Sequence, residues 1–326
     1  MDDENSISCT SAPENYLIER MNEIKLFAPA TVANVSCGFD VMGFCLDTVG
    51  DEMVIRKVGK KGIFITKIEG FDLPKDPKLN VAGISALAMY EALDLDFGFE
   101  IDIYKNIKPG SGIGSSAASA VGSVFGMNEL LNRPFNKTQL TEFAMKGEAF
   151  ISKSEHADNI APAIFGGFIL AKSVAPLEIL EIPAPDDLFA TVIHPQIEIK
   201  TADSRALLPK EVSLQDATKQ WANLGGLIHG LHTNNYEVIK SSLKDVIVEP
   251  HRSKLIPHFN EVKEAALNAS ALGSGISGSG PSIFSLCKGL ETAEKVKEAI
   301  QNIYSKTGIE FDIHVSKINT EGVKIL

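Results

Sequence analysis

The sequence predicts an α+β fold with two domains. The chain has 326 residues, which at about 150 residues per domain suggests two of them. Segments with strand periodicity and segments with helix periodicity follow one another irregularly. Mixed α+β layers are therefore favoured over a doubly wound sheet, in which strands and helices alternate. Hydrophobic residues make up 44% of the chain and charged residues 22%, a globular composition that can bury a large core without disulfides or metal ions.

Hydrophobic periodicity places the elements in order. Alternating apolar residues or short apolar runs predict strands at residues 24–27, 53–58, 62–68, 97–107, 166–174, 177–182, 188–194, 283–287 and 310–317. We expect the strands at 53–58 and 62–68 to pair with each other. Apolar residues at helical spacing predict helices at residues 80–93, 115–131, 136–152, 214–232, 258–269 and 291–304. Asn80 is a candidate N-cap, since its side chain can accept a hydrogen bond from the first helical turn.

The linear order also predicts domain boundaries. Residues 1–21 are acidic and polar and lack both an apolar face and the features of a signal peptide, so we expect a disordered extension in which Met21 could be the natural start. Residues 22–182 are expected to form the N-terminal domain. Residues 183–326 are expected to form the C-terminal domain, beginning at the Pro- and Asp-rich linker 183–187.

The charge balance argues against polyanionic partners. With 31 basic and 42 acidic residues, the net charge is −11, whereas nucleic-acid-binding surfaces are usually basic. Nucleic acids and anionic membranes are poor candidate partners, and no apolar run reaches the ~18 residues of a membrane span. Any phosphate group must therefore be held locally, by backbone N–H groups, a metal ion or a few placed cations.

The four cysteines indicate a reducing compartment. Cys9, Cys37, Cys45 and Cys287 form no C-x-x-C pair, which is typical of free thiols in a cytoplasmic protein. Cys37 or Cys45 could be a nucleophile, but small buried side chains are the favoured interpretation.

The strongest functional signal is the glycine- and serine-rich segment at 109–118. It lies between a predicted strand and a predicted helix, where unpaired N–H groups and the positive end of the helix dipole bind phosphate. Ser115 and Ser116 could cap the helix and also supply hydroxyls to a phosphate or to Mg²⁺. The candidate ATP-binding residues here are Pro109, Gly110, Ser111, Gly112, Ile113, Gly114, Ser115, Ser116, Ala117 and Ala118.

Other interpretations of this segment are weaker. A Walker A loop requires a Lys that the segment lacks. Residues 112–117 fit the loose G-x-G-x-x-A dinucleotide pattern, but no acidic residue ends a following strand. A tight turn with a serine N-cap is the remaining alternative.

A second glycine–serine cluster spans residues 273–282. Gly275, Ser277, Gly278 and Ser279 are its candidate ATP-binding residues. Two such loops far apart in the sequence suggest one polyphosphate held from two sides, with a flexible turn as the alternative. No G-x-S-x-G elbow occurs, which argues against an α/β-hydrolase.

Isolated polar residues supply further candidates. Glu148 with the serine pair would give the small protein shell that Mg²⁺ prefers when phosphates complete its coordination, although a lone helical Glu is usually solvated. Asp158 is a candidate acceptor for a substrate hydroxyl, or else a turn-forming residue. Arg205 and Arg252 suit carboxylate recognition, although isolated arginines are usually surface residues.

Two more groups of polar residues also allow a functional and an ordinary structural interpretation. Asn34 and Asp40 could together hold an ammonium or hydroxyl group, or be ordinary turn residues. The H-x-x-H pair His229 and His232 is not a zinc spacing without further ligands.

Taken together, these loops resemble the GHMP kinase superfamily. Segment 109–118 is similar to its signature Pro-x-x-x-Gly-Leu-Gly-Ser-Ser-Ala, with two departures: Pro109 lies one residue closer to the glycines, and Ile113 replaces Leu. Segments 28–40 and 155–162 look specifically like the homoserine-phosphorylating branch. The resemblance runs from about residue 24 to the C-terminus.

The resemblance implies an N-terminal domain with a left-handed β-α-β unit and a ferredoxin-like C-terminal domain, with the site between them. It implies ATP, Mg²⁺ and L-homoserine as ligands, O-phospho-L-homoserine as the product on the route to threonine, and a homodimer. Another small alcohol as substrate, or a non-catalytic ligand sensor of the same fold, are the alternatives.

It also implies roles for individual residues. Arg205 and Arg252 would bind the α-carboxylate, Asn34 and Asp40 the amino end or the hydroxyl, and Asn80 the adenine. Ser116 and Glu148 would hold Mg²⁺. The catalytic pair would be Asp158 and Asn159, with Asp158 either abstracting the hydroxyl proton or only orienting it. The homoserine site would be lined by Asn34, Asp40, His156, Asp158, Thr201, Arg205 and Arg252.

Overall fold

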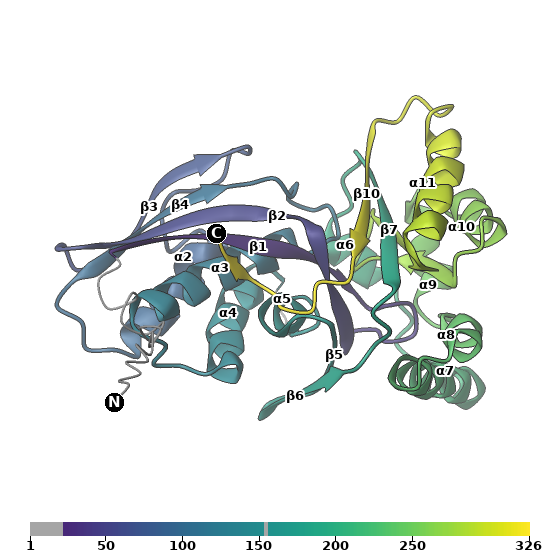
Figure 1. Ribbon diagram of the computed structural model, residues 1–326, viewed down its shortest axis with the longest axis horizontal. Helices are drawn as coiled ribbons and strands as arrows, with labels where there is room; N and C mark the ends of the chain where they lie inside the picture. The colour runs from purple at the N-terminus through teal and green to yellow at the C-terminus, as the bar shows by residue number, and fades with distance from the viewer. Residues whose placement is uncertain (1–21, 153–155) are drawn as a thin grey trace, which may run out of the picture.

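The computed structural model describes residues 22–152 and 156–326. The extension expected at residues 1–21 lies outside this part of the chain. Within it, the mixed α+β architecture is confirmed: two sheets lie side by side, each covered by helices (Figure 1). No helix in the two described ranges has the length and apolarity that crossing a membrane requires.

The larger sheet has seven strands. The main path runs β11-β1-β2-β4-β3, while β5 pairs with β2 and β6 extends it. Its strands are β1 (Glu23–Ala33), β2 (Met42–Val58), β3 (Gly62–Glu69), β4 (Gly98–Tyr104), β5 (Phe168–Val174), β6 (Leu177–Ile182) and β11 (Lys324–Ile325). Strands β3 and β4 are parallel and are connected through α2, so they form the expected β-α-β unit.

Four helices cover one face of this sheet (Figure 1). They are α2 (Val81–Glu91), α3 (Ser115–Leu130), α4 (Lys137–Ser152) and α5 (Ile160–Phe165). Helix α3 packs directly on the strands because Gly122 and Gly126 have no side chain. A Cβ at these positions would come within 2.3 Å of Met53 Sδ and 2.7 Å of Ile55 Cδ1, respectively. This close packing fixes the N-terminal end of α3 relative to the sheet.

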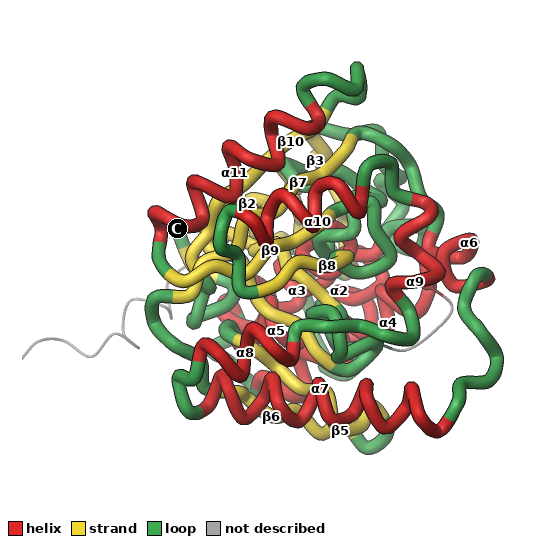
Figure 2. Tube along the Cα trace, turned by 90° about the vertical axis from the view of Figure 1, so that its right-hand side faces the viewer, coloured by secondary structure: helices red, strands yellow, loops and turns green. Residues whose placement is uncertain are grey.

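The smaller sheet has the β-α-β-β-α-β order of ferredoxin-like folds. Its four antiparallel strands lie in the order β10-β7-β9-β8. They are β7 (Leu188–Pro195), β8 (Gly273–Ile276), β9 (Ile283–Lys288) and β10 (Phe311–Lys317). Helices α10 (Phe259–Asn268) and α11 (Leu290–Tyr304) cover its outer face (Figure 2).

The remaining helices connect β7 to α10. They are α6 (Thr201–Ala206), α7 (Leu214–His232), α8 (Tyr236–Ser242), α9 (Glu249–Arg252) and the short 3₁₀ helix η1 (Ser253–Leu255). Helices α7 and α8 form an antiparallel hairpin beside β5 and β6 (Figure 2). The short helices α6 and α9 instead contact each other through a hydrogen bond from Arg252 Nε to the Ser204 carbonyl.

The C-terminal segment returns to the first sheet. After β10, Asn319 donates its N–H to the Cys45 carbonyl, and β11 pairs with β1. The boundaries predicted at 22–182 and 183–326 stay a prediction, but the first sheet includes a strand from beyond residue 183.

Most predicted elements are confirmed, but four predictions about the strands are wrong. Strands β1 and β2 are longer than the predicted 24–27 and 53–58. The strands at 53–58 and 62–68 do not pair, since β4 lies between them. The predicted glycine loop at 273–282 begins with a strand, β8, because the small residues of this stretch fit a buried position against β9.

Candidate active site

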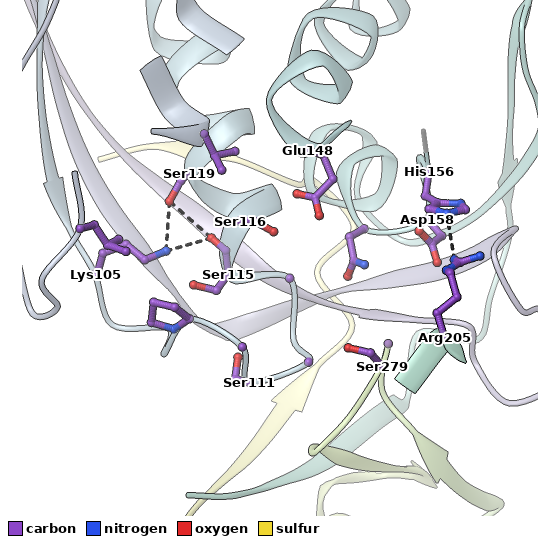
Figure 3. A pocket seen from close by; sticks show the side chains of 18 of the residues that line it. Lys105, Ser111, Ser115, Ser116, Ser119, Glu148, His156, Asp158, Arg205 and Ser279 are labelled. Carbon is purple, nitrogen blue, oxygen red and sulfur yellow. Dashed lines mark hydrogen bonds between the residues drawn. The ribbon is translucent and has the colours of Figure 1, made fainter. Parts of the chain in front are cut away.

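A cleft of about 340 Å³ opens at the junction of the two halves (Figure 3). Its volume lies in the range of small-molecule sites. Most of the residues predicted for the site line it: Asn34, Asp40, Asn80, Pro109, Gly110, Ser111, Gly112, Gly114, Ser115, Ser116, Glu148, His156, Asp158, Asn159, Arg205, Arg252, Gly278 and Ser279.

The glycine loop before α3 has the geometry of an anion site. Gly110, Gly112 and Gly114 have φ values of 75°, 84° and 72° and alternate with residues of ordinary φ, which turns successive N–H groups toward one concave side. Ser115 does not cap α3 as predicted. The N-cap is Gly114, with no side-chain cap, and the Ser115 hydroxyl instead donates to the Ile107 carbonyl at 2.8 Å.

A buried ion pair supports this loop from below. Lys105 Nζ donates to Asp51, to the Ser115 carbonyl at 2.9 Å and to Ser119 Oγ at 3.0 Å (Figure 3). Asp51 Oδ1 also accepts the backbone N–H groups of Asn106 and Ile107. The pair therefore connects the chain that enters the loop with the helix that leaves it, a role that sequence reasoning missed.

The second glycine–serine cluster packs against the first loop. Ser277 Oγ donates to the Gly112 carbonyl at 2.7 Å, and Ser282 Oγ donates to the Ser111 carbonyl at 2.6 Å. A Cβ at Gly112 would lie 2.7 Å from the Gly280 carbonyl oxygen, so only glycine allows this approach. The two clusters do meet, and Gly278 and Ser279 of the second one line the cleft.

Ser116 and Glu148 face each other across the middle of the cleft (Figure 3). The Glu148 side chain is not solvated as a lone helical Glu usually is: its Oε2 has almost no exposed surface. Burial raises the pKa of this carboxyl group, and a hydrogen bond from Ser116 opposes the shift. A cation beside Glu148 would favour its charged form.

At the other end of the cleft, Arg205 links an acid and an imidazole. Its Nη2 donates to both carboxylate oxygens of Asp40 at 3.0 Å and to His156 Nε2 at 2.9 Å. Since Nε2 accepts, the imidazole is neutral, which agrees with a His156 pKa lowered chiefly by burial. The sequence-predicted residues Asp40, His156 and Arg205 thus form one cluster.

Arg252 is a buried cation of the cleft, with 3% of its surface exposed. Its Nη1 donates to the Gly278 carbonyl at 3.1 Å and its Nε to the Ser204 carbonyl at 3.4 Å. Burial lowers its pKa most, while Asp40 raises it. Among the residues that the structure describes, no carboxylate lies within 4.0 Å of this guanidinium.

Asn34 shapes the loop that carries Asp40. Its Nδ2 donates to the Gly278 carbonyl at 2.7 Å, and its Oδ1 accepts the Asp40 N–H at 2.9 Å. Residues 34–36 all have positive φ, a strained conformation in non-glycine residues that often occurs at functional sites. Both ends of the Asn34 amide are therefore engaged within the chain.

Asp158 is buried between the two ends of the cleft. Burial first, and then the charges of Asp40 and Glu148, raise its pKa to about 7. Its neighbour Asn159 precedes α5, and Asn159 Oδ1 accepts a 2.8 Å hydrogen bond from Thr31 Oγ1. A carboxyl group with a pKa near 7 is available in both protonation states for proton transfer.

Some predicted residues do not line the cleft. Ile113, Ala117 and Ala118 are buried in the core below the loop. Gly275 lies in β8, and the Ser277 hydroxyl is bound to the first loop. Thr201 begins α6, and its role stays a prediction. Sequence reasoning also missed six lining residues: Leu73, Pro74, Leu79, Val81, Lys105 and Ser119.

Within the described residues, neither the cysteines nor the H-x-x-H pair lines the cleft. Cys37, Cys45 and Cys287 are free and buried, and burial raises the pKa of the Cys37 thiol to about 12, so a nucleophilic role is disfavoured. His229 and His232 lie in α7. No group of three or more His, Cys, Asp or Glu suited to a metal ion occurs within residues 22–152 and 156–326.

Comparison with known proteins places these features in a family. Residues 80–167 match the family described as GHMP kinases N terminal domain, and residues 217–306 match GHMP kinases C terminal. The chain is 44% identical to a homoserine kinase from Chlorobium phaeobacteroides strain BS1, over 94% of this chain and all of the relative. It is 36% identical to a homoserine kinase from Xanthomonas campestris pv. campestris, over 94% and 95%.

A solved structure gives the same result. The crystal structure of homoserine kinase from Cytophaga hutchinsonii superposes with a TM-score of 0.91 at 48% identity, covering 94% of this chain and 98% of that one. The similarity extends over both sheets and the cleft between them.

Proposed function

The chain belongs to the homoserine kinases of the GHMP kinase family. On this premise, we propose which parts of the cleft bind ATP and which bind homoserine. The enzyme uses ATP to convert the side-chain hydroxyl of L-homoserine to a phosphate ester, a step of threonine biosynthesis. This assignment rests on one observation: two different kinds of anion-binding group lie in separate parts of one cleft. Backbone N–H groups gather at the glycine loop, and two guanidinium groups gather around Phe39 elsewhere in the cleft.

The guanidinium end would bind the amino acid. No carboxylate of the described residues lies within 4.0 Å of the buried Arg252 guanidinium, so the substrate's α-carboxylate would provide a direct counter-charge, with Arg205 beside it. Asp40 would receive the α-ammonium group. Asn34 would act by holding Asp40 in place, since both ends of its amide are already engaged.

The glycine-loop end would bind the triphosphate. The alternating glycines and the start of α3 present N–H groups and a positive dipole to the phosphates, which explains how an acidic protein can bind a polyanion. Asn80 caps α2 at the edge of the same cleft. We propose that it marks the adenine end, together with the apolar Leu73, Pro74 and Leu79.

Ser116 and Glu148 fit a Mg²⁺ ion. A buried carboxylate beside a hydroxyl offers the hard oxygen ligands that Mg²⁺ takes when phosphates supply the others. When bound there, the ion would neutralise charge on the phosphates. The chain's own contribution is to hold these two oxygens between the phosphate loop and Asp158.

Asp158 would accept a hydrogen bond from the reacting hydroxyl. With a pKa of about 7, it can orient the hydroxyl as a carboxylate and take up its proton as the hydroxyl oxygen bonds to the γ-phosphorus of ATP and the bond from that phosphorus to ADP breaks. Phosphoryl transfer depends mainly on positioning and charge neutralisation. Orientation by Asp158 and Asn159 is therefore the larger part of the proposed role.

A coupled ADP-release assay tests the substrate end. We expect turnover with L-homoserine and little with shikimate, mevalonate or galactose at equal concentrations. Faster turnover with one of the other alcohols would overturn the amino-acid assignment. We also propose a cytoplasmic location, which the free buried thiols support, and a homodimer, which light scattering on the purified protein tests.

A further inference from the structure

One aromatic ring contacts both guanidinium groups of the cleft. Arg205 Cζ lies 5.6 Å from the centroid of Phe39, and Arg252 Cζ lies 5.1 Å from it. Both distances are within the ~6 Å range of cation–π attraction. The two arginines come from α6 and α9, so Phe39 is the common contact of two short helices that are far apart in the sequence.

The backbone on each side of Phe39 is held in place. Gly38 N donates to the Asn34 carbonyl at 2.8 Å, and Asp40 N donates to Asn34 Oδ1 at 2.9 Å. Asn34 is itself tied to the Gly278 carbonyl, which also accepts a hydrogen bond from Arg252. The position of the ring is therefore defined by the same loop that positions Asp40.

The positive charges of Arg205 and Arg252 repel each other, and Arg252 is buried. Burial lowers the Arg252 pKa most; the nearby Asp40 raises it, and the positive charge of Arg205 lowers it again. Arg205 has Asp40 as a direct partner. Arg252 has two carbonyl oxygens and the π face of Phe39, and the attraction of a ring for a cation is greatest where water is excluded.

We propose that Phe39 is a positioning residue for recognition of the amino-acid substrate. Its π face holds the guanidinium groups of Arg205 and Arg252 at the spacing needed to bind one carboxylate between them. This inference rests on the proposed function, because it assumes that these arginines meet the α-carboxylate. The adjacent Asp40 directs Arg205, whereas Phe39 acts on both arginines at once.

Graded fluorination tests the electrostatic part of this role. Replacing Phe39 with 4-fluoro-, 3,5-difluoro- and 3,4,5-trifluorophenylalanine withdraws charge from the ring face with little change in shape. We expect the KM for homoserine to rise stepwise along the series, while kcat and the KM for ATP stay within about two-fold. Phe39→Leu, which removes the π face, should raise the homoserine KM by about 5- to 30-fold.

A matched control is available on the larger sheet. Lys60 lies 4.7 Å from the ring centroid of Phe64 in β3, a cation–π pair that does not line the cleft. The same fluorinated residues at position 64 should leave the homoserine KM unchanged. A flat series at position 39, or equal slopes at positions 39 and 64, would overturn the inference even if Phe39→Leu fails to fold.

A second substrate separates this inference from the proposed function. 3-Aminopropan-1-ol is homoserine without its carboxylate, so its kcat/KM should not follow the fluorination series. A slope equal to that for homoserine would show that Phe39 acts on something other than carboxylate binding. In the same assay, Arg205→Ala should lower kcat/KM more for homoserine than for 3-aminopropan-1-ol. An equal loss of kcat/KM for the two substrates would refute the carboxylate assignment itself, whatever the fluorination series shows.

Discussion

The side chains of Lys105 and Asp51 form an ion pair beneath the glycine loop that precedes α3, and neither is more than 1% exposed. Lys105 is also bound to Ser115 and Ser119, at the start of α3. All three N–H donors of Lys105 are thus directed to the chain itself. This cation therefore supports the loop rather than replacing the Lys of a Walker A motif.

Breaking this pair should weaken both folding and ATP binding. Removing one partner of a buried pair leaves an uncompensated charge, which costs about 3–5 kcal/mol. We expect Asp51→Asn to lower the free energy of unfolding in urea by about this amount and to raise the KM for ATP several-fold, with a smaller effect on homoserine. Loss of stability without any change in the ATP KM would limit the pair to a structural role.

The exposed pair Lys25–Glu52 is a matched control on neighbouring positions of the sheet. Its side chains are 48% and 40% exposed, and surface pairs contribute about 1 kcal/mol or less. Glu52→Gln should therefore change neither the urea midpoint nor the ATP KM appreciably.

Glu148→Gln should abolish the response to Mg²⁺ while preserving the fold. The substitution keeps the shape of the side chain and removes the negative charge, which burial already disfavours. We expect at least a hundred-fold loss of kcat at every Mg²⁺ concentration and an unfolding temperature equal to or above that of the wild type. Glu142→Gln, at an exposed position of the same helix, is the control. A wild-type Mg²⁺ titration of Glu148→Gln would refute the metal assignment.

Local sequence patterns predicted the conformation of the glycine loop before α3 well, whereas its binding of phosphate stays a prediction. The three alternating glycines needed for its positive φ values are visible in the sequence, as is the helix that follows. The Lys105–Asp51 pair and the Phe39 contact were not predicted, since each joins residues from distant parts of the chain. The strand pairing was wrong for the same reason: β4 is inserted between β2 and β3 although it follows both.

The chemistry of individual residues was harder to predict than their place in a motif. Ser115 belongs to the loop, but the Ile107 carbonyl takes its hydroxyl and Gly114 is the N-cap. Glu148 lies at a helical position where solvation is the usual outcome, yet its carboxylate is buried because α4 packs beside α3. Burial of this kind depends on tertiary packing, which periodicity alone does not determine.

The raised pKa of Asp158 should make the protein less stable as the pH rises. Well below pH 3.8 the carboxyl group is protonated in both the folded and the unfolded chain. Between its ordinary pKa of 3.8 and about 7, only the unfolded chain ionises, so unfolding becomes more favourable by up to about 4 kcal/mol. Asp158→Asn should therefore be more stable than the wild type at pH 8 and nearly equal to it at pH 4.

Urea unfolding at a series of pH values measures this difference, with Asp94→Asn at an exposed position as the control. The same titration has a kinetic counterpart: kcat/KM of the wild type should show an apparent pKa near 7. If Asp158→Asn is less stable than the wild type at pH 8, then the site stabilises the ionised form of Asp158 and the inferred rise in its pKa is wrong.

Arg205 should discriminate between substrates with and without a carboxylate. Truncating one partner of a buried charge pair costs about 2–5 kcal/mol, but the Arg205 side chain is 40% exposed, so the lower end of this range applies. Arg205→Ala should therefore raise the KM for homoserine by roughly ten- to a hundred-fold, while the KM for ATP changes little.

A thermodynamic cycle that pairs the wild type and Arg205→Ala with homoserine and 3-aminopropan-1-ol isolates the contact with the carboxylate. In the wild type, the substrate without a carboxylate leaves Arg205 paired only with Asp40 and His156. In the variant there is no guanidinium at this position to lose its partner. The penalty for removing the carboxylate should therefore be smaller in the variant, and the difference is the interaction energy of Arg205 with the carboxylate. Lys210→Ala, which removes an exposed cation outside the cleft, should leave both substrates unaffected. If the two losses add without interaction, Arg205 does not contact the carboxylate, and homoserine must lie in the cleft in another orientation.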